Sequence, residues 1–260
     1  MIDIHTHILH GVDDGPDTIE ISIEMARDAF SSGTTIIVAS PHIIPGAFEA
    51  DMVTILSRVR ELNSALKSRR IPVSVLPGAE VALESDVPQR LASGRLCTIG
   101  GDSHYLLLEL PFQGIPVFSE QVIFKLSSRG YVPVIAHPER NNRIISDPNI
   151  FLRFVQLGAL GQVNAGSLTG EFGAHVRRAA EILVTCGMAH VIASDGHSVS
   201  TRRCRLDRAR DRVIRLVGRE RAMQMTEEFP KAIINDIDIE PGEAEAYRPA
   251  KRFVFGWGRR

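Results

Sequence analysis

Two short apolar runs, near opposite ends of the chain, each finish in a pair of possible metal ligands. The first is MIDIHTH, ending in His5 and His7, and the second is VIASDGH, ending in Asp195 and His197. Alternate residues of a β-strand project from the same face, so each run offers two ligands in one direction. A His-x-His pair alone is weak, because nine histidines in 260 residues give about 0.3 such pairs by chance. Its repetition at two strand ends points to a metal site.

Further strand-like runs are also followed by imidazoles or carboxylates. The periodicity predicts strands over residues 2–5, 35–39, 72–77, 105–109, 132–136, 160–164 and 190–194. Six of these seven runs end in ligand types, and a loop adds one more: His5, His7, Asp14, His42, Glu80, Glu109, His137, Asp195 and His197. A lone histidine at a strand end is usually structural. Converging carboxylates, however, would repel one another unless cations neutralised them, so the set predicts two or three metal ions.

Mixed imidazole and carboxylate ligands without thiolate suit manganese, zinc or iron and argue against a structural cysteine-rich zinc site. Clustered metals that share a carboxylate and a water are typical of hydrolytic centres. A phosphoester substrate would also require arginine, whose guanidinium binds phosphoryl oxygens in a fork. Arg140 and Arg202 follow the ligands closely, although Arg203 and Arg205 crowd Arg202 and allow an ordinary surface role for it.

Amphipathic helical patterns separate most of the predicted strands. The first begins near Pro16 and ends at Gly33, and the others span 50–69, 117–129, 147–157, 174–187 and 202–217. Apolar strands alternating with helices predict a parallel sheet covered by helices, and seven units favour a barrel over an open sheet. In such a barrel the active site lies at the carboxyl ends of the strands. No glycine-rich nucleotide motif follows the first strand, which disfavours nucleotide-binding folds.

The composition is that of one globular domain with 44% hydrophobic and 23% charged residues. The net charge of −1 gives no basic field for nucleic acid or an anionic membrane. Three cysteines without a CxxC spacing give no disulfide framework and fit a reducing compartment. The amino terminus lacks the features of a signal peptide, and no apolar stretch approaches about 18 residues, so we expect a cytoplasmic protein without a transmembrane segment.

Cys204 and Arg210 have the C-x5-R spacing of thiol phosphatases. That chemistry needs a glycine-rich loop of exposed N–H groups and a thiolate of low pKa at a helix amino terminus. The stretch CRLDRAR is rich in arginine, has no glycine and is predicted to lie inside a helix. We therefore interpret the spacing as coincidental.

At these residues the chain resembles the PHP (polymerase and histidinol phosphatase) superfamily of metallo-hydrolases. It is most similar to the manganese-dependent tyrosine-protein phosphatases encoded with bacterial capsule and exopolysaccharide synthesis proteins. The similar segments occur in family order over about residues 1–235: MIDIHTHILHGVDDGP at 1–16, PH at 41–42, GAE at 78–80, LLLELP at 106–111, VIAHPERN at 134–141, QVNAGSLTGEFG at 162–173 and VIASDGHS at 191–198. Their combination is highly specific.

The resemblance implies a distorted seven-stranded βα barrel of PHP type, similar to a TIM barrel, that holds Mn²⁺, with Zn or Fe as alternatives. It implies three ligand sets: His5, His7, Glu80 and Asp195; Glu80, Glu109 and His137; and Asp14, His42 and His197. Arg140 and Arg202 match the family's phosphate-binding arginines. The acid that protonates the tyrosyl oxygen stays open among His10, Asp13 and Glu139.

We expect the barrel to span residues 1–236 and a tail to span 237–260, acidic through Glu245 and then basic and aromatic. Such a tail is either frayed and solvated or a docking segment for an acidic partner or membrane surface. The leading hypothesis is dephosphorylation of a bacterial tyrosine kinase that controls capsule or exopolysaccharide synthesis. The alternatives are a phosphatase of histidinol phosphate or a nucleotide, and a non-catalytic regulatory binding protein. A homo-oligomer is compatible with each.

Overall fold

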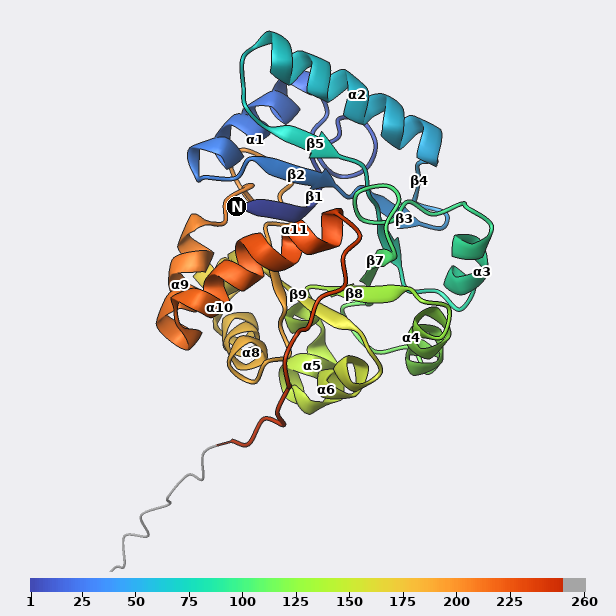
Figure 1. The fold of residues 1–260 in the computed structure, drawn as a ribbon, viewed down its shortest axis with the longest axis vertical. Coiled ribbons are helices and arrows are strands. Elements are labelled where there is room, and N and C mark those ends of the chain that lie inside the picture. Colours follow the sequence, from blue (N-terminus) through green and yellow to red (C-terminus); the bar gives the residue numbers. More distant parts are fainter. Residues whose placement is uncertain (250–260) are drawn as a thin grey trace, which may run out of the picture.

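The computed structural model describes residues 1–249, which form a mixed α/β fold with helices packed outside a set of mainly parallel strands (Figure 1). The strands are β1 (Ile2–Thr6), β2 (Ile36–Ala39), β3 (His42–Ile44), β4 (Phe48–Glu49), β5 (Ser74–Leu76), β6 (Glu80–Ala82), β7 (Tyr105–Glu109), β8 (Val132–Ala136), β9 (Leu160–Asn164) and β10 (Val191–Ala193). All seven predicted strands are therefore present. The short strands β3, β4 and β6 were not predicted.

The strands form two sheets, with orders β1-β2-β5 and β10-β9-β8-β7-β6-β3-β4. All pairs are parallel except β3 with β4. Pro41 separates β2 from β3, and Pro77 separates β5 from β6. Proline has no N–H to donate to a ladder, so each chain segment breaks there and resumes in the other sheet. The parallel α/β architecture is confirmed, but no closed seven-stranded barrel is found within residues 1–249.

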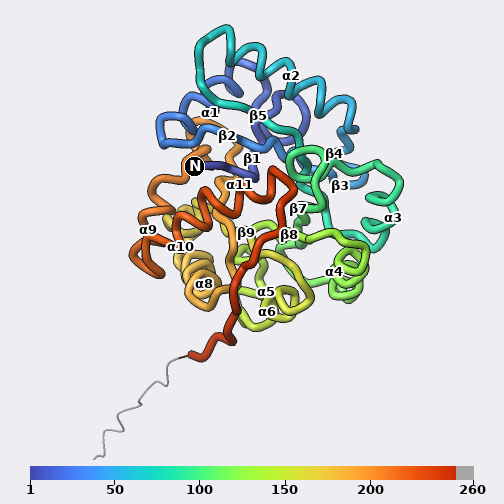
Figure 2. Tube along the Cα trace, viewed as in Figure 1, coloured from blue at the N-terminus to red at the C-terminus, as the bar shows by residue number. Residues whose placement is uncertain are grey.

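The helices follow the strands along the chain and cover their outer faces (Figure 2). They are α1 (Ile19–Ser31), α2 (Met52–Ser68), α3 (Val87–Ala92), α4 (Ser119–Ser127), α5 (Asn142–Ser146), α6 (Asn149–Gln156), α7 (Ala165–Thr169), α8 (Ala174–Thr185), α9 (Asp207–Val217), α10 (Arg219–Met223) and α11 (Phe229–Ile234). The last long helix begins at Asp207 rather than at the predicted 202. The backbone before it turns back on itself, with the His197 N–H donating to the Arg202 carbonyl at 2.8 Å.

Alternate strand residues face two different apolar clusters. In β7, Tyr105 and Leu107 belong to an inner cluster, whereas Leu106 and Leu108 pack beneath the helices. The inner cluster draws residues from both sheets and from Phe229 of α11. One face of the strands therefore encloses an apolar interior, and α11 covers its end near the amino ends of the strands.

The inner face becomes polar toward the carboxyl ends of the strands. In β9 the inner positions change from Leu160 to Gln162 and Asn164, all buried. In β1 the pairing with β2 shifts between Asp3 and Thr6. The irregularity changes which alternate residues face inward, so Ile4 packs in the inner cluster while its neighbour His5 joins the polar end.

The chain after α11 runs along the outside of the fold. The Tyr105 hydroxyl donates to the Ile237 carbonyl at 2.8 Å, and the Tyr247 N–H donates to Asn149 Oδ1 at 2.8 Å. The proposed division at residue 236 stays a prediction, and the basic and aromatic residues from Lys251 onward lie outside the described residues. Within residues 1–249, no helix is both long and apolar enough to cross a membrane.

Candidate metal centre

The nine predicted ligands converge on one side of the fold, at or after the carboxyl ends of β1, β7, β8 and β10 and at the first residues of β3 and β6. We call this set the central cluster. Their donor atoms fall into four overlapping groups, each with all atoms within 4.8 Å of one another: His7, Asp14, His42 and His197; His5, His7 and Glu80; His5, His137 and Asp195; and His42, Glu80 and Glu109. All nine residues are thus brought together. The groups share members, so the division into three separate ligand sets stays a prediction.

Glu80, the first residue of β6, lies at the centre of the cluster and is completely buried. Its Oε2 atom is 3.4 Å from His5 Nε2 and 2.9 Å from His42 Nδ1, and its Oε1 atom is 3.0 Å from His137 Nε2. Burial acts to raise the pKa of this carboxyl, but the surrounding imidazoles hold the pKa well below its usual value. Glu80 therefore presents a carboxylate to histidines from three strand ends.

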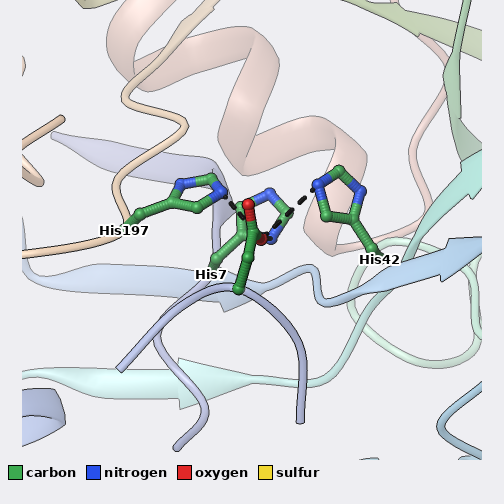
Figure 3. Close-up of side chains that lie close together, drawn as sticks. His7, His42 and His197 are labelled. Carbon is green, nitrogen blue, oxygen red and sulfur yellow. Dashed lines mark ion pairs between the residues drawn. The ribbon is translucent and has the colours of Figure 1, made fainter. Parts of the chain in front are cut away.

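Three imidazoles gather at one side of the cluster, as Figure 3 shows for His7, His42 and His197. Asp14, from the loop after β1, places Oδ1 3.2 Å from His197 Nε2 and 3.7 Å from His42 Nε2. Its side chain is 46% exposed, unlike the buried carboxylates of Glu80 and Asp195. This group is consequently the part of the cluster most open to solvent.

Several potential metal-ligand atoms in the cluster are buried without a hydrogen-bond partner. They include Glu80 Oε2, His42 Nδ1 and His197 Nε2, although oxygen and nitrogen atoms lie nearby. The Nε2 atoms of His5 and His7 are 3.2 Å apart. Buried polar atoms are normally paired, and lone pairs that converge in this way would be satisfied by cations. The donor set therefore fits bound metal ions.

Hydrogen bonds from outside the cluster orient its imidazoles. His7 Nδ1 donates to Asp13 Oδ2 at 2.6 Å, and His5 Nδ1 donates to Gln162 Oε1 at 2.7 Å. In the neutral imidazole, each bond places the proton on Nδ1 and leaves Nε2 free and directed into the cluster, as is usual for metal-binding histidines. Burial acts to raise the pKa of Asp13, but its bond with His7 keeps that pKa below the usual value.

Asp195 connects the cluster to both predicted arginines. Arg140 Nη1 donates to its Oδ2 atom at 2.9 Å, and Arg202 Nη2 donates to its Oδ1 atom at 2.7 Å. Asn164 Nδ2 also donates to Oδ2, at 2.7 Å. Both arginine side chains are partly exposed, whereas that of Asp195 is buried. The guanidinium groups therefore lie between the buried ligands and solvent.

Sequence reasoning missed the residues that support the ligands. Gln162 and Asn164 lie on β9, the one predicted strand credited with no ligand, and alternation along LGQVN could have identified them. Two aromatic rings flank Arg140, whose Cζ atom is 4.7 Å from the Phe112 ring centre and 4.4 Å from that of Phe172. These phenylalanines are distant in sequence, and no local pattern indicates them.

Cys204 lies in the loop before α9 and not inside a helix as predicted. Its side chain is buried, and burial, with nearby carboxylates, raises the pKa of the thiol well above its usual value. Ser194 and the backbone of Gly196 pack close to it. A nucleophilic cysteine needs the opposite conditions, a low pKa and access to substrate, so the C-x5-R spacing does not form a thiol phosphatase site.

A parallel α/β fold with a cluster of histidines and carboxylates at its strand ends defines a protein of the metallo-hydrolase type. The chain belongs to the capsular polysaccharide synthesis family CpsB/CapC, whose family model matches residues 1–235. It is 41% identical over 202 residues to the tyrosine-protein phosphatase YwqE of Bacillus subtilis (strain 168), covering 78% of this chain and 79% of that protein.

A solved structure agrees with this membership. The chain superposes with a TM-score of 0.92 and 35% identity on a structure described with YwqE from Bacillus subtilis and CpsB from Streptococcus pneumoniae, which are metal-dependent tyrosine phosphatases. The superposition covers 96% of this chain and 100% of the other chain. The lactonase Lmo2620 from Listeria monocytogenes has a TM-score of 0.56 at 11% identity and covers 90% of this chain and 94% of its own, a likeness of fold alone.

Proposed function

We propose that this protein is a metal-dependent phosphatase that hydrolyses phosphotyrosine in proteins at the central cluster. The observation that carries the proposal is Asp195, a buried carboxylate within 3.5 Å of His5 Nε2 that is held by both Arg140 and Arg202. It joins a metal-binding surface to two groups that bind phosphoryl oxygens. Phosphotyrosine is proposed as the substrate because similar proteins are tyrosine phosphatases.

Two or three ions, with Mn²⁺ as the favoured metal and Zn or Fe as alternatives, would be held by the nine residues of the central cluster. We assign His5, His7, Glu80 and Asp195 to one ion, Glu80, Glu109 and His137 to a second, and Asp14, His42 and His197 to a third. The unpaired donor atoms of Glu80, His42 and His197 support this assignment. When bound, such ions would lower the pKa of water and neutralise phosphoryl oxygens.

The chain's own residues bind and orient the phosphoryl group. Arg140 and Arg202 each commit one N–H to Asp195, which leaves others to stabilise charge on the equatorial oxygens. Phe112 and Phe172 restrict the Arg140 guanidinium from two sides, so little side-chain freedom is lost when the phosphate binds.

The structure also narrows the choice of general acid. The Asp13 carboxylate accepts from His7 Nδ1 and from the His42 and Gly15 N–H groups, and its pKa is lowered, so we propose that Asp13 positions His7. Glu139 is completely buried and accepts from the Asn164 N–H. His10, in the loop that carries Asp14, is then the candidate that protonates the tyrosyl oxygen.

We further propose that the two sheets are parts of one distorted seven-unit barrel over residues 1–236, in which the strand pairing is interrupted. The inner apolar cluster takes side chains from both sheets, and Thr6 forms a parallel bridge with Gly196 where β1 approaches the end of β10. Breaks after β2 and β5 account for the distortion.

The physiological substrate that we propose is a bacterial tyrosine kinase that controls capsule or exopolysaccharide synthesis, dephosphorylated in the cytoplasm. The family's connection with capsular polysaccharide synthesis supports this choice. The three free cysteines fit a reducing compartment.

The decisive experiment assays the metal-loaded protein in parallel on phosphotyrosine peptides, phosphoserine peptides, histidinol phosphate and nucleotides. We expect the highest kcat/KM on phosphotyrosine peptides. A higher kcat/KM on histidinol phosphate or a nucleotide would establish the small-molecule alternative. No turnover of any phosphoester by protein with full metal content would instead favour the non-catalytic regulator.

A further inference from the structure

Three adjoining hollows lead away from Arg202 toward α9. The first, about 490 Å³, is lined by Phe172 and Arg202 and shares Glu171 and Arg203 with the second, about 250 Å³. The second shares Arg208 with the third, about 330 Å³, between α7, α8 and α9. We call the whole the arginine groove, after its seven lining arginines: Arg177, Arg202, Arg203, Arg205, Arg208, Arg212 and Arg215.

The groove carries positive charge that the carboxylates in it and beside it do not fully neutralise. Five of its arginines form ion pairs: Arg203 and Arg205 with Asp28, Arg205 also with Asp207, Arg177 and Arg212 with Glu181, and Arg202 with Asp195. Arg208 and Arg215 are exposed, and neither forms an ion pair within residues 1–249. Since the whole chain has a net charge of −1, this excess is a local feature and not a property of the entire surface.

The two unpaired arginines share one face of α9, because they are seven residues, or two helical turns, apart. The separation is about 10 Å along the helix axis, close to the length of three residues of extended chain. An extended peptide lying along the groove would therefore meet a guanidinium at about every third residue. Each guanidinium can bind a carboxylate in a fork.

We propose that the arginine groove binds an acidic segment of the phosphoprotein substrate, on one side of the phosphotyrosine. The inference rests on the proposed function, because the groove starts at Arg202, beside the candidate phosphate-binding position. Glu171, Asp207 and Asp211 interrupt its positive charge. That alternation suits spaced carboxylates better than the continuous charge of a nucleic-acid backbone.

The test compares three phosphotyrosine peptides, flanked by glutamate on the amino side, by glutamate on the carboxyl side, or by glutamine on both. The variant is Arg208→Glu with Arg215→Glu. Its matched control is Arg60→Glu with Lys67→Glu, which reverses two exposed charges at the same spacing on α2, a helix on another part of the fold (Figure 1). Circular dichroism verifies that both variants fold.

We expect one glutamate peptide to exceed the glutamine peptide in kcat/KM by about tenfold, a preference that weakens with salt. The α9 variant should lose that preference and keep its turnover of a small aryl phosphate, while the α2 control keeps both. Equal kcat/KM on all three peptides, or an α9 variant that keeps the preference, would overturn the proposal.

Direct binding separates this proposal from the proposed function. Fluorescence anisotropy with a labelled, unphosphorylated glutamate peptide should show binding to the native protein and at least tenfold weaker binding to the α9 variant, whether or not any phosphoester is hydrolysed. If the wild-type protein turns over no aryl phosphate yet binds the peptide, the proposed function is wrong, whereas the binding of acidic segments by the groove is supported. Tighter binding of duplex DNA or anionic vesicles than of the peptide would assign the groove to another partner.

Discussion

Buried histidines lie near both ends of the strands, but their neighbours differ. At the carboxyl ends, burial acts to lower the pKa of His7, yet the carboxylates of Asp13, Asp195 and Glu80 raise it well above the usual value. At the amino end of β10, burial and then Arg221 lower the pKa of His190 to about 3. Burial alone keeps an imidazole neutral, whereas a surrounding set of carboxylates attracts positive charge.

These different surroundings distinguish the amino ends of the strands, which stabilise the fold, from the carboxyl ends, which are suited to catalysis. His190 Nδ1 accepts from the Gly161 N–H at 2.9 Å, while its Nε2 atom is buried without a partner and has only the positive charge of Arg221 acting on it. The central cluster instead brings several such ligand atoms together, on Glu80, His42 and His197, among carboxylates. The polar end of the strands therefore fits bound cations.

Metal removal should have the largest effect. Chelation should abolish phosphatase activity and lower the thermal midpoint, because the carboxylates of Glu80, Glu109 and Asp195 would then repel one another in a buried site. Reloading with Mn²⁺ should restore both. Elemental analysis should give two or three ions per chain, and a maximum of one ion in fully active protein would contradict the polynuclear centre.

Loss of either proposed phosphate-binding arginine should have the second largest effect. Arg140→Ala or Arg202→Ala should lower kcat/KM on phosphotyrosine peptides by roughly 10²-fold, the scale of losing one preorganised charge-stabilising donor. Metal content should not change. Arg210→Ala, which removes a guanidinium that pairs with Asp211, is the control. Wild-type kcat/KM in either site variant would show that the arginine is an ordinary surface residue.

The free energy of unfolding should depend on pH through His190, at the amino end of β10. In the unfolded chain this imidazole binds a proton below its ordinary pKa of 6.5, whereas in the folded chain it does so only near pH 3. The contribution of neutral His190 to the free energy of unfolding is therefore fully present above pH 6.5 and is lost as the pH falls toward 3. Between pH 7 and 4 the wild type should lose roughly 3 kcal/mol more than His190→Asn. Urea unfolding at both pH values measures this, and parallel profiles would refute it.

Removing the buried thiol should have the smallest effect on activity. Cys204→Ser should keep nearly full kcat/KM, because the thiol is buried and its raised pKa keeps it protonated. A loss of a hundredfold or more in a folded variant with normal metal content would revive a thiol mechanism.

The sequence predicted seven of the strands. It also predicted that the nine central residues meet, because parallel strands place their carboxyl ends at one edge. It could not predict β6, which resumes after Pro77, or the shift in β1 that turns His5 inward. Both depend on pairing with strands distant along the chain. The phenylalanines around Arg140 were missed for the same reason.

Within residues 1–249, five residues other than glycine have positive φ, and three of them are central or proposed phosphate-binding residues: His137 at 31°, Asp195 at 53° and Arg202 at 50°. Such backbone costs of order 1 kcal/mol or more, and glycine would relieve it. Glycine at Arg202 would relieve this strain and keep every residue of the central cluster, so a thermostability selection carried out without an activity screen would favour it. At His137 and Asp195 the loss of a proposed metal ligand would offset the same relief, so the Arg202 codon is the one that libraries built on this scaffold need to exclude.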